Sequence, residues 1–175
     1  MESETLGEAV ASLGTQELEG RFERHQSLRQ RGLEGSLRGG RWGAPGAFAV
    51  LYLGRPRESV VAEAYRHLVD GRPGMRPEMV APRRLIKVEV RIEKVLDLRS
   101  AGALGALGLD RDVVSGPHEA CQEIAAAAFD AGCGALIANS ASGLGETLAV
   151  FTARRAEIEA LGEETWEGLP PDPRR

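Results

Sequence analysis

The chain has 175 residues, a length that fits one domain with a substantial buried core. A net charge of −4 argues against a protein that binds nucleic acid through a broad basic surface, and no apolar run approaches the roughly 20 residues of a membrane helix. The two cysteines and three histidines lack the spacing of a zinc site or a disulfide framework, so we expect neither.

The N-terminal quarter of the chain contains few regular elements. We predict that residues 1–20 form a short amphipathic helix or a loose arm. The start, Met1-Glu2-Ser3-Glu4, lacks the basic and apolar regions of a signal peptide, from which we expect a cytoplasmic location. Residues 21–47 are rich in glycine and arginine with little periodicity, which indicates a long functional loop region. The apolar run 48–53 predicts a strand buried on both faces.

Helices and strands alternate in the middle of the chain. Apolar residues at helical spacing predict a helix over about 57–69, which Pro56 can open. A proline-rich loop over 73–84 follows. Apolar and charged residues then alternate over 85–96, which predicts a strand with one buried and one polar face. Residues 100–114 suggest a short helical turn.

The remaining elements complete the predicted domain. We expect a helix from Pro117 to about residue 131, strands over 135–138 and 147–151, and a final helix over 155–161. The predicted fold class is therefore α/β (α+β): one compact domain with a mixed sheet flanked by helices. We place its arm at 1–20, its body at 21–162 and a flexible tail at 163–175.

Three residues suggest a binding site in the first half of the chain. Arg41 follows the pair Gly39-Gly40, Tyr52 interrupts an aliphatic strand, and Glu63 lies among apolar helix residues; they are spaced 11 residues apart. Glycines allow close approach of a ligand to the backbone, and a guanidinium suits a phosphate. A tyrosine ring can stack on a cationic heterocycle, and a carboxylate in an apolar setting is costly unless it has a role. Taken singly, each could instead be an ordinary structural residue.

A polar turn adds a fourth candidate. Ser140 lies just beyond the predicted strand 135–138, at the kind of strand end where ligands gather in open α/β sheets. It can bind a substrate or merely stabilise the turn, and Ser142 lies close enough to compete for the same role. No nucleophile elbow, P-loop or dinucleotide-binding glycine motif is present.

The order and spacing of these pieces resemble the RES domain, a family named for its Arg, Glu and Ser. The matching pieces are Gly40-Arg41-Trp42, the strand around Tyr52, Glu63 on its helix, Gln122, and Ser140-Ala141, within residues 20–152. Two departures are Gly43, where the family often has asparagine, and Asn139, where it often has proline.

The resemblance implies a fold similar to ADP-ribosyltransferase toxins and NAD as substrate, without a metal. It implies that Arg41 contacts the NAD phosphates, that Tyr52 positions the nicotinamide ribose, and that Glu63 stabilises positive charge as the glycosidic bond breaks. Ser140 would hydrogen-bond the nicotinamide or ribose, and Arg21 would be a further binding arginine. Family members are often toxins held inactive by a helix-turn-helix (Xre-like) antitoxin; we also allow for a homodimer.

Two other functions remain open from the sequence. The same pocket could sense a nucleotide, or the arginines between Arg21 and Arg41 could bind a partner protein, without any catalysis. A toxin acting on RNA is a third hypothesis, against which the negative net charge and the few aromatic residues argue.

Overall fold

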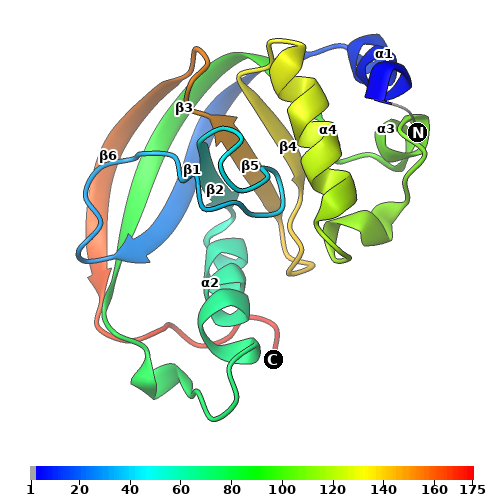
Figure 1. Ribbon diagram of the computed structural model, residues 1–175. Coiled ribbons are helices and arrows are strands. Elements are labelled where there is room, and N and C mark those ends of the chain that lie inside the picture. The colour runs from blue at the N-terminus through cyan, green and yellow to red at the C-terminus, as the bar shows by residue number, and fades with distance from the viewer. Residues whose placement is uncertain (1–2) are drawn as a thin grey trace.

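The computed structural model describes residues 3–175, and within them a twisted sheet is flanked by helices (Figure 1). The strands are β1 (Gln16–Ser27), β2 (Val50–Arg55), β3 (Arg83–Asp97), β4 (Ala135–Asn139), β5 (Glu146–Phe151) and β6 (Glu157–Trp166). The α-helices are α1 (Ser3–Leu13), α2 (Arg57–Tyr65), α3 (Ala101–Ala106) and α4 (Glu119–Asp130). Shorter turns are η1 (Arg66–Asp70, a π-helix), η2 (Pro77–Met79) and η3 (Arg111–Val114).

The sheet closes on itself. Its strand order is β1-β2-β5-β4-β3-β6, and β1 also pairs along its length with β3. Only β3 and β4 are parallel among these pairs. The closure is loose at one seam, because β1 meets β2 at a single registered position, Glu23 opposite Gly54. The sheet is therefore mixed, as predicted.

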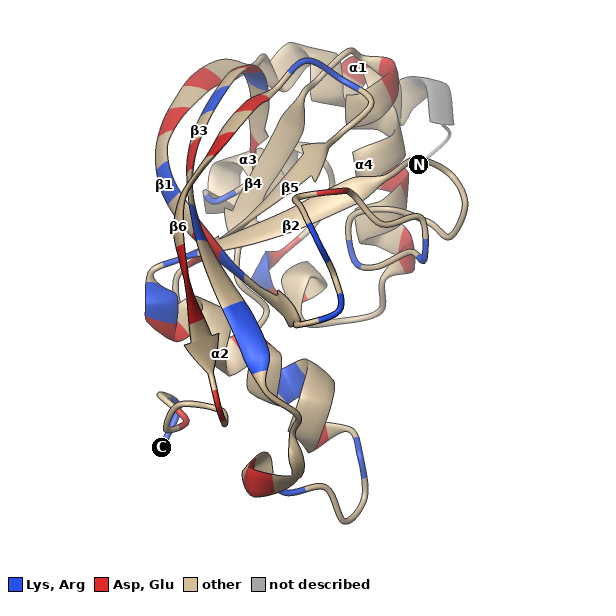
Figure 2. Ribbon diagram, turned by 90° about the vertical axis from the view of Figure 1, so that its left-hand side faces the viewer, with Lys and Arg blue, Asp and Glu red and all other residues tan. Residues whose placement is uncertain are grey.

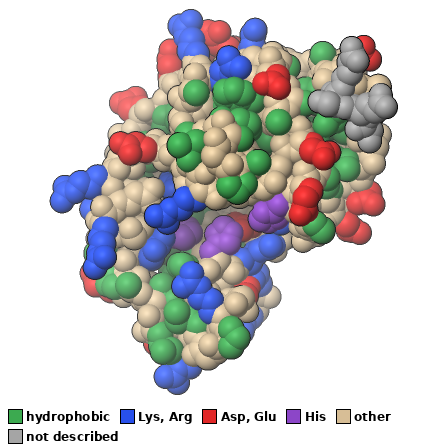
Figure 3. Space-filling view, in the orientation of Figure 1, with side chains coloured by type: hydrophobic (Ala, Val, Ile, Leu, Met, Phe, Trp, Pro, Cys, Tyr) green, Lys and Arg blue, Asp and Glu red, His purple; other side chains and the backbone are tan. Residues whose placement is uncertain are grey.

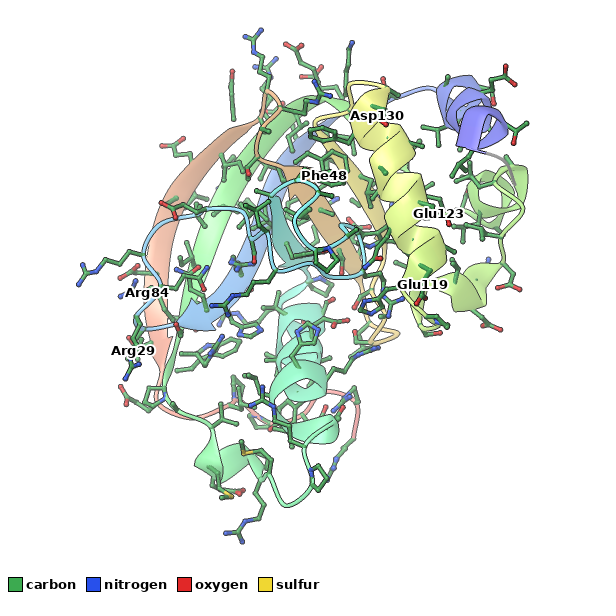
Figure 4. The ribbon with its side chains drawn as sticks, viewed as in Figure 1. Arg29, Phe48, Arg84, Glu119, Glu123 and Asp130 are labelled. Carbon is green, nitrogen blue, oxygen red and sulfur yellow. The ribbon has the colours of Figure 1, made fainter. Side chains whose placement is uncertain are left out.

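Three apolar clusters hold the layers together. One fills the interior of the closed sheet, around Phe22, Leu51 and Val88. A second lies between the sheet and helices α1, α3 and α4. In that layer Phe48 stacks on Phe129 of α4 at 4.4 Å between ring centroids, while the acidic residues of α4 are exposed (Figure 4). The third cluster packs α2 against Leu85 at the start of β3 and against Trp166 at the end of β6.

Acidic and basic side chains are mixed on β1 and β3, whereas the charged side chains of β6 are acidic (Figure 2). Cross-strand ion pairs join Arg21 to Glu89, and Arg91 to Glu17. Exposed pairs of this kind contribute little stability each. Within residues 3–175, no helix combines the length and apolarity needed to cross a membrane.

The predicted helix over 155–161 was wrong, because these residues begin β6. Nearly all of β6 is exposed, so its apolar positions do not alternate in the way that reveals a half-buried strand. The predicted loop over 21–47 was wrong at its start, where β1 continues to Ser27. Gly20 and Arg24 occupy inward positions of β1 and mask its alternation.

Both ends of the described chain carry regular structure. Residues 3–13 form the helix α1, one of the two alternatives expected for residues 1–20, whereas β1 already begins at Gln16; residues 1–2 lie outside the described part. At the other end, β6 runs to Trp166 through the start of the predicted flexible tail. Beyond it the Tyr65 hydroxyl donates to the carbonyl of Pro170 at 2.8 Å, and Arg174 pairs with Asp70 at 2.6 Å. These contacts fasten the C-terminal segment against α2 and η1.

Candidate active site

Glu63 and the two candidate serines form one hydrogen-bonded cluster. The Ser140 hydroxyl donates to Glu63 Oε1 at 2.7 Å, and the backbone amide of Ser142 donates to the same oxygen at 3.0 Å. The two serine hydroxyls lie 2.7 Å apart. With Ser140 donating to the carboxylate, the Ser142 hydroxyl can donate to Ser140. Both serines therefore hold the carboxylate, one by its side chain and the other by its backbone.

A tight turn between β4 and β5 brings the serines to Glu63. The Ser140 amide donates to the carbonyl of Gly145 at 2.9 Å and closes the turn. Gly145 has φ +64°, and a Cβ there would lie 2.3 Å from the carbonyl oxygen of Arg55. Only glycine fits both the backbone angle and the space. The turn thus packs against the start of α2, the helix that carries Glu63.

Arg41 is held in place by backbone carbonyls. Its Nη1 donates to the carbonyls of Gly116 at 2.9 Å and Val113 at 3.3 Å. On the preceding residue, the carbonyl of Gly40 accepts a hydrogen bond from Gln122 of α4 at 2.9 Å. Carbonyls do not neutralise a guanidinium, so Arg41 keeps its charge available for an anion.

Tyr52 anchors the loop that carries Arg41. Its hydroxyl oxygen accepts a hydrogen bond from the backbone amide of Trp42 at 3.0 Å. The loop lies so close that a Cβ on Gly40 would be 2.7 Å from that oxygen. Burial raises the pKa of Tyr52, so the phenol stays protonated at neutral pH and retains a proton to donate. The structure thus brings Tyr52 and Arg41 together through the loop.

Arg24 is a candidate site residue that the sequence reasoning missed. It donates to the carbonyl of Tyr52 at 3.0 Å and to Gln26 Oε1 at 3.3 Å, and no carboxylate among residues 3–175 pairs with it. Burial, with a contribution from Arg83, lowers its pKa. A half-buried guanidinium without a carboxylate partner is costly, which indicates a position suited to an anionic ligand.

Arg21 is not part of this group. Its side chain is 82% exposed and pairs with Glu89 on the outer face of the sheet. Residues of a strand alternate between faces, and Phe22 points inward, so Arg24 shares its face and Arg21 does not. Recognising a strand from Leu18 onward would have identified Arg24.

Histidine side chains, scattered in the sequence, gather with basic side chains in a hollow on one face of the molecule (Figure 3). Burial, then Arg83, Arg24 and His67, lower the pKa of His25 to about 3. Partial burial and the charge of Arg41 lower the pKa of His118, with smaller contributions from His67 and Arg66.

The charges that lower the pKa of His118 come from both parts of the site. They include Arg41 and, more weakly, Arg66, whose Nε lies 3.8 Å from Glu63 Oε2. A cavity of about 420 Å³, lined by Arg66, Ser142 and Arg174 among others, adjoins the carboxylate cluster. The cavity therefore brings the cations Arg66 and Arg174 beside one firmly held carboxylate. Among the described residues, no group of His, Cys, Asp and Glu side chains is arranged to hold a metal ion.

Comparison with known proteins identifies the family and the fold. The family model of the RES domain matches residues 19–167, which confirms the resemblance predicted from the motifs. The fold is similar to a chain in the crystal structure of the M. tuberculosis MbcT–MbcA toxin–antitoxin complex, with a TM-score of 0.81 and 24% identity. The alignment covers 93% of this chain and 92% of that one. No curated protein sequence matches the chain.

Proposed function

The chain belongs to the RES domain family, and from this premise we propose that it is an NAD-consuming enzyme that cleaves the bond between nicotinamide and ribose. The observation that carries the proposal is the Glu63 carboxylate, held by Ser140 and Ser142, in a chain whose arginines Arg24 and Arg41 bond to backbone carbonyls and lack carboxylate partners among the described residues. NAD carries groups that match these side chains: a diphosphate for the arginines, and a cationic nicotinamide, linked to it through ribose, for the carboxylate.

The chemistry requires charge stabilisation more than proton transfer. When the bond between C1′ and the nicotinamide nitrogen breaks, its electron pair goes to the ring nitrogen, so the leaving group departs neutral and needs no general acid. Positive charge develops on the ribose, and the Glu63 carboxylate would stabilise it electrostatically. An acceptor oxygen then bonds to C1′ and loses its proton. Water, phosphate and a protein side chain all remain candidates for that acceptor.

We assign the other residues by the part of NAD that each could hold. Arg41 and Arg24 would bind the diphosphate, with Arg24 taking the role that the sequence suggested for Arg21. Tyr52 would position the nicotinamide ribose while anchoring the Arg41 loop. Ser140 would orient Glu63 and could share its hydroxyl with the substrate. Fixing the substrate between the arginines and the carboxylate supplies much of the rate enhancement in such reactions.

We further propose that the protein is the toxin of a toxin–antitoxin pair that acts on the cytoplasmic NAD pool. Family membership supports this role, and the structurally similar chain comes from a toxin–antitoxin complex. The proposed partner is a helix-turn-helix antitoxin that covers the hollow. Expression of the chain should arrest growth and deplete NAD, and Glu63→Gln should remove both effects. Growth arrest that persists with Glu63→Gln would contradict the proposed link to NAD.

The direct test is incubation of the purified protein with NAD, with and without inorganic phosphate, followed by chromatography of the products. We expect free nicotinamide, and the partner product identifies the acceptor as water or phosphate. Binding of NAD without release of nicotinamide, across these acceptors and a lysate, would favour the non-catalytic binding module instead.

A further inference from the structure

Arg66 stands one helical turn beyond Glu63 and contacts the same serine loop from the other side. Its Nη1 donates to the carbonyl of Ala141, which lies between the two serines that hold Glu63. Its Nε lies 3.8 Å from Glu63 Oε2. The helix and the loop are therefore joined twice, once through Glu63 and once through Arg66, in a closed ring of contacts.

Glu63 and Arg66 are three residues apart, a spacing that places both side chains on one face of a helix. Helix α2 ends at Tyr65 and widens into the π-helical turn η1, which starts at Arg66. The Arg66 amide donates to the carbonyls of Ala62, four residues back, and Glu63, three residues back, so the hydrogen bonding up to Arg66 is still that of α2 and the wider turn follows it. Such π-turns occur frequently at functional sites, and this one begins within one turn of the candidate catalytic carboxylate.

The two oxygens of Glu63 have different surroundings. Oε1 accepts two hydrogen bonds from the serine loop. Oε2 faces Arg66 at 3.8 Å and His67 at 3.9 Å, distances too long for hydrogen bonds, and no hydrogen bond to it is found within residues 3–175. Oε2 is thus the oxygen free to face a substrate. Its direction depends on how firmly the contacts between Glu63, the serine loop and Arg66 are held.

We propose that Arg66 is a positioning residue: by tying Ala141 to the helix, it fixes the serine loop and so aims Glu63 Oε2 at the developing positive charge. This inference rests on the proposed function for its catalytic consequence, but its structural part concerns only the ring. A planar guanidinium can contact a carboxylate and a carbonyl at once, whereas a lysine ammonium on a flexible stem reaches one at a time.

The first arm of the test measures steady-state nicotinamide release by wild type, Arg66→Ala and Arg66→Lys. Because small displacements of a catalytic group cost up to about 10² in rate, we expect kcat to fall about 10- to 100-fold in Arg66→Ala with KM within about twofold. Arg66→Lys should recover part of kcat. Arg72→Ala is the matched control, since no ion pair or hydrogen bond of this exposed side chain is found in the described part of the chain.

The second arm needs no substrate. Amide hydrogen exchange of Ser142, whose N–H donates to Glu63, should be at least about tenfold faster in Arg66→Ala than in wild type and unchanged in Arg72→Ala. If wild type released no nicotinamide, the proposed function would fall, and the exchange of Ser142 would still decide whether Arg66 holds the loop. An unchanged exchange rate, or a raised KM with an unchanged kcat, would overturn the positioning role.

Discussion

The contact between Gly40 and Tyr52 yields a prediction whose size follows from the structure. A Cβ added at Gly40 would lie 2.7 Å from the Tyr52 hydroxyl oxygen, which is 0.7 Å inside the 3.4 Å at which ordinary contact begins. The backbone angle of Gly40 is not in the left-handed region, so the cost of Gly40→Ala comes from this clash rather than from strain. Overpacking of this kind costs about 1–3 kcal/mol.

The clash also threatens the hydrogen bond between Tyr52 and the Trp42 amide. If the ring moves to admit the new methyl group, that bond of 3.0 Å is lost and the amide loses its partner. Tyr52→Phe removes both the clashing oxygen and the acceptor, and an unsatisfied buried amide costs about 1–3 kcal/mol. The two substitutions share one contact, so their effects should overlap.

The assay is urea unfolding of Gly40→Ala, Tyr52→Phe and the double variant, with KM for NAD measured on each. We expect the double variant to be less destabilised than the sum of the single variants by about 1 kcal/mol or more, and KM to rise in all three because the Arg41 loop loosens. Gly71→Ala is the control, since a Cβ there meets no atom within 4 Å. Strictly additive effects would show that the close contact is not what constrains Gly40.

Three further predictions concern charge. Arg24→Ala should raise KM for NAD at least about tenfold, whereas Arg21→Ala should leave it unchanged; equal effects would refute the assignment of the inward arginine. The folded-state pKa of His25, about 3, lies below its ordinary value of 6.5, so its stabilising contribution is present above pH 6.5 and is lost as pH falls toward 3. Urea unfolding of wild type should therefore show a loss of about 1–2 kcal/mol between pH 6.5 and 5 that His25→Phe lacks; parallel curves would contradict this. Arg174→Ala should lower the free energy of unfolding by about 0.5–1 kcal/mol and speed proteolysis at the C-terminal segment, by removing the pair with Asp70, and unchanged proteolysis would mean that the segment is held by other contacts.

The sequence predicted the apolar elements well because their burial appears directly as periodicity. The alternation over 85–96 corresponds to β3, and the apolar runs around Leu51 and Leu136 correspond to β2 and β4. It predicted β6 wrongly because an exposed edge strand needs few apolar residues, and only its last residue, Trp166, is buried. The closure of the sheet was also hidden, since pairing of β1 with β3 joins residues far apart in the chain.

The candidate site residues that belong to a sequence motif could be predicted. Those that only the folded chain brings together could not. Glu63 and Ser140 were singled out by their surroundings, and the structure joins them at 2.7 Å. Arg24 was overlooked because its strand was interpreted as a loop. Only in a strand do successive side chains alternate between two faces, so the inward direction of Arg24 could not be predicted. Arg66 has no signal of its own, since its importance arises from the π-turn and from Ala141 on a distant loop.

The central claim, that Glu63 drives cleavage of NAD, is tested most directly by the rate of nicotinamide release from Glu63→Gln. The amide keeps the shape of the carboxylate but not its charge, so its circular dichroism and unfolding midpoint should match wild type closely. Loss of one such electrostatic contact should slow release by about 10²–10³. A folded Glu63→Gln variant that releases nicotinamide at the wild-type rate would contradict the account.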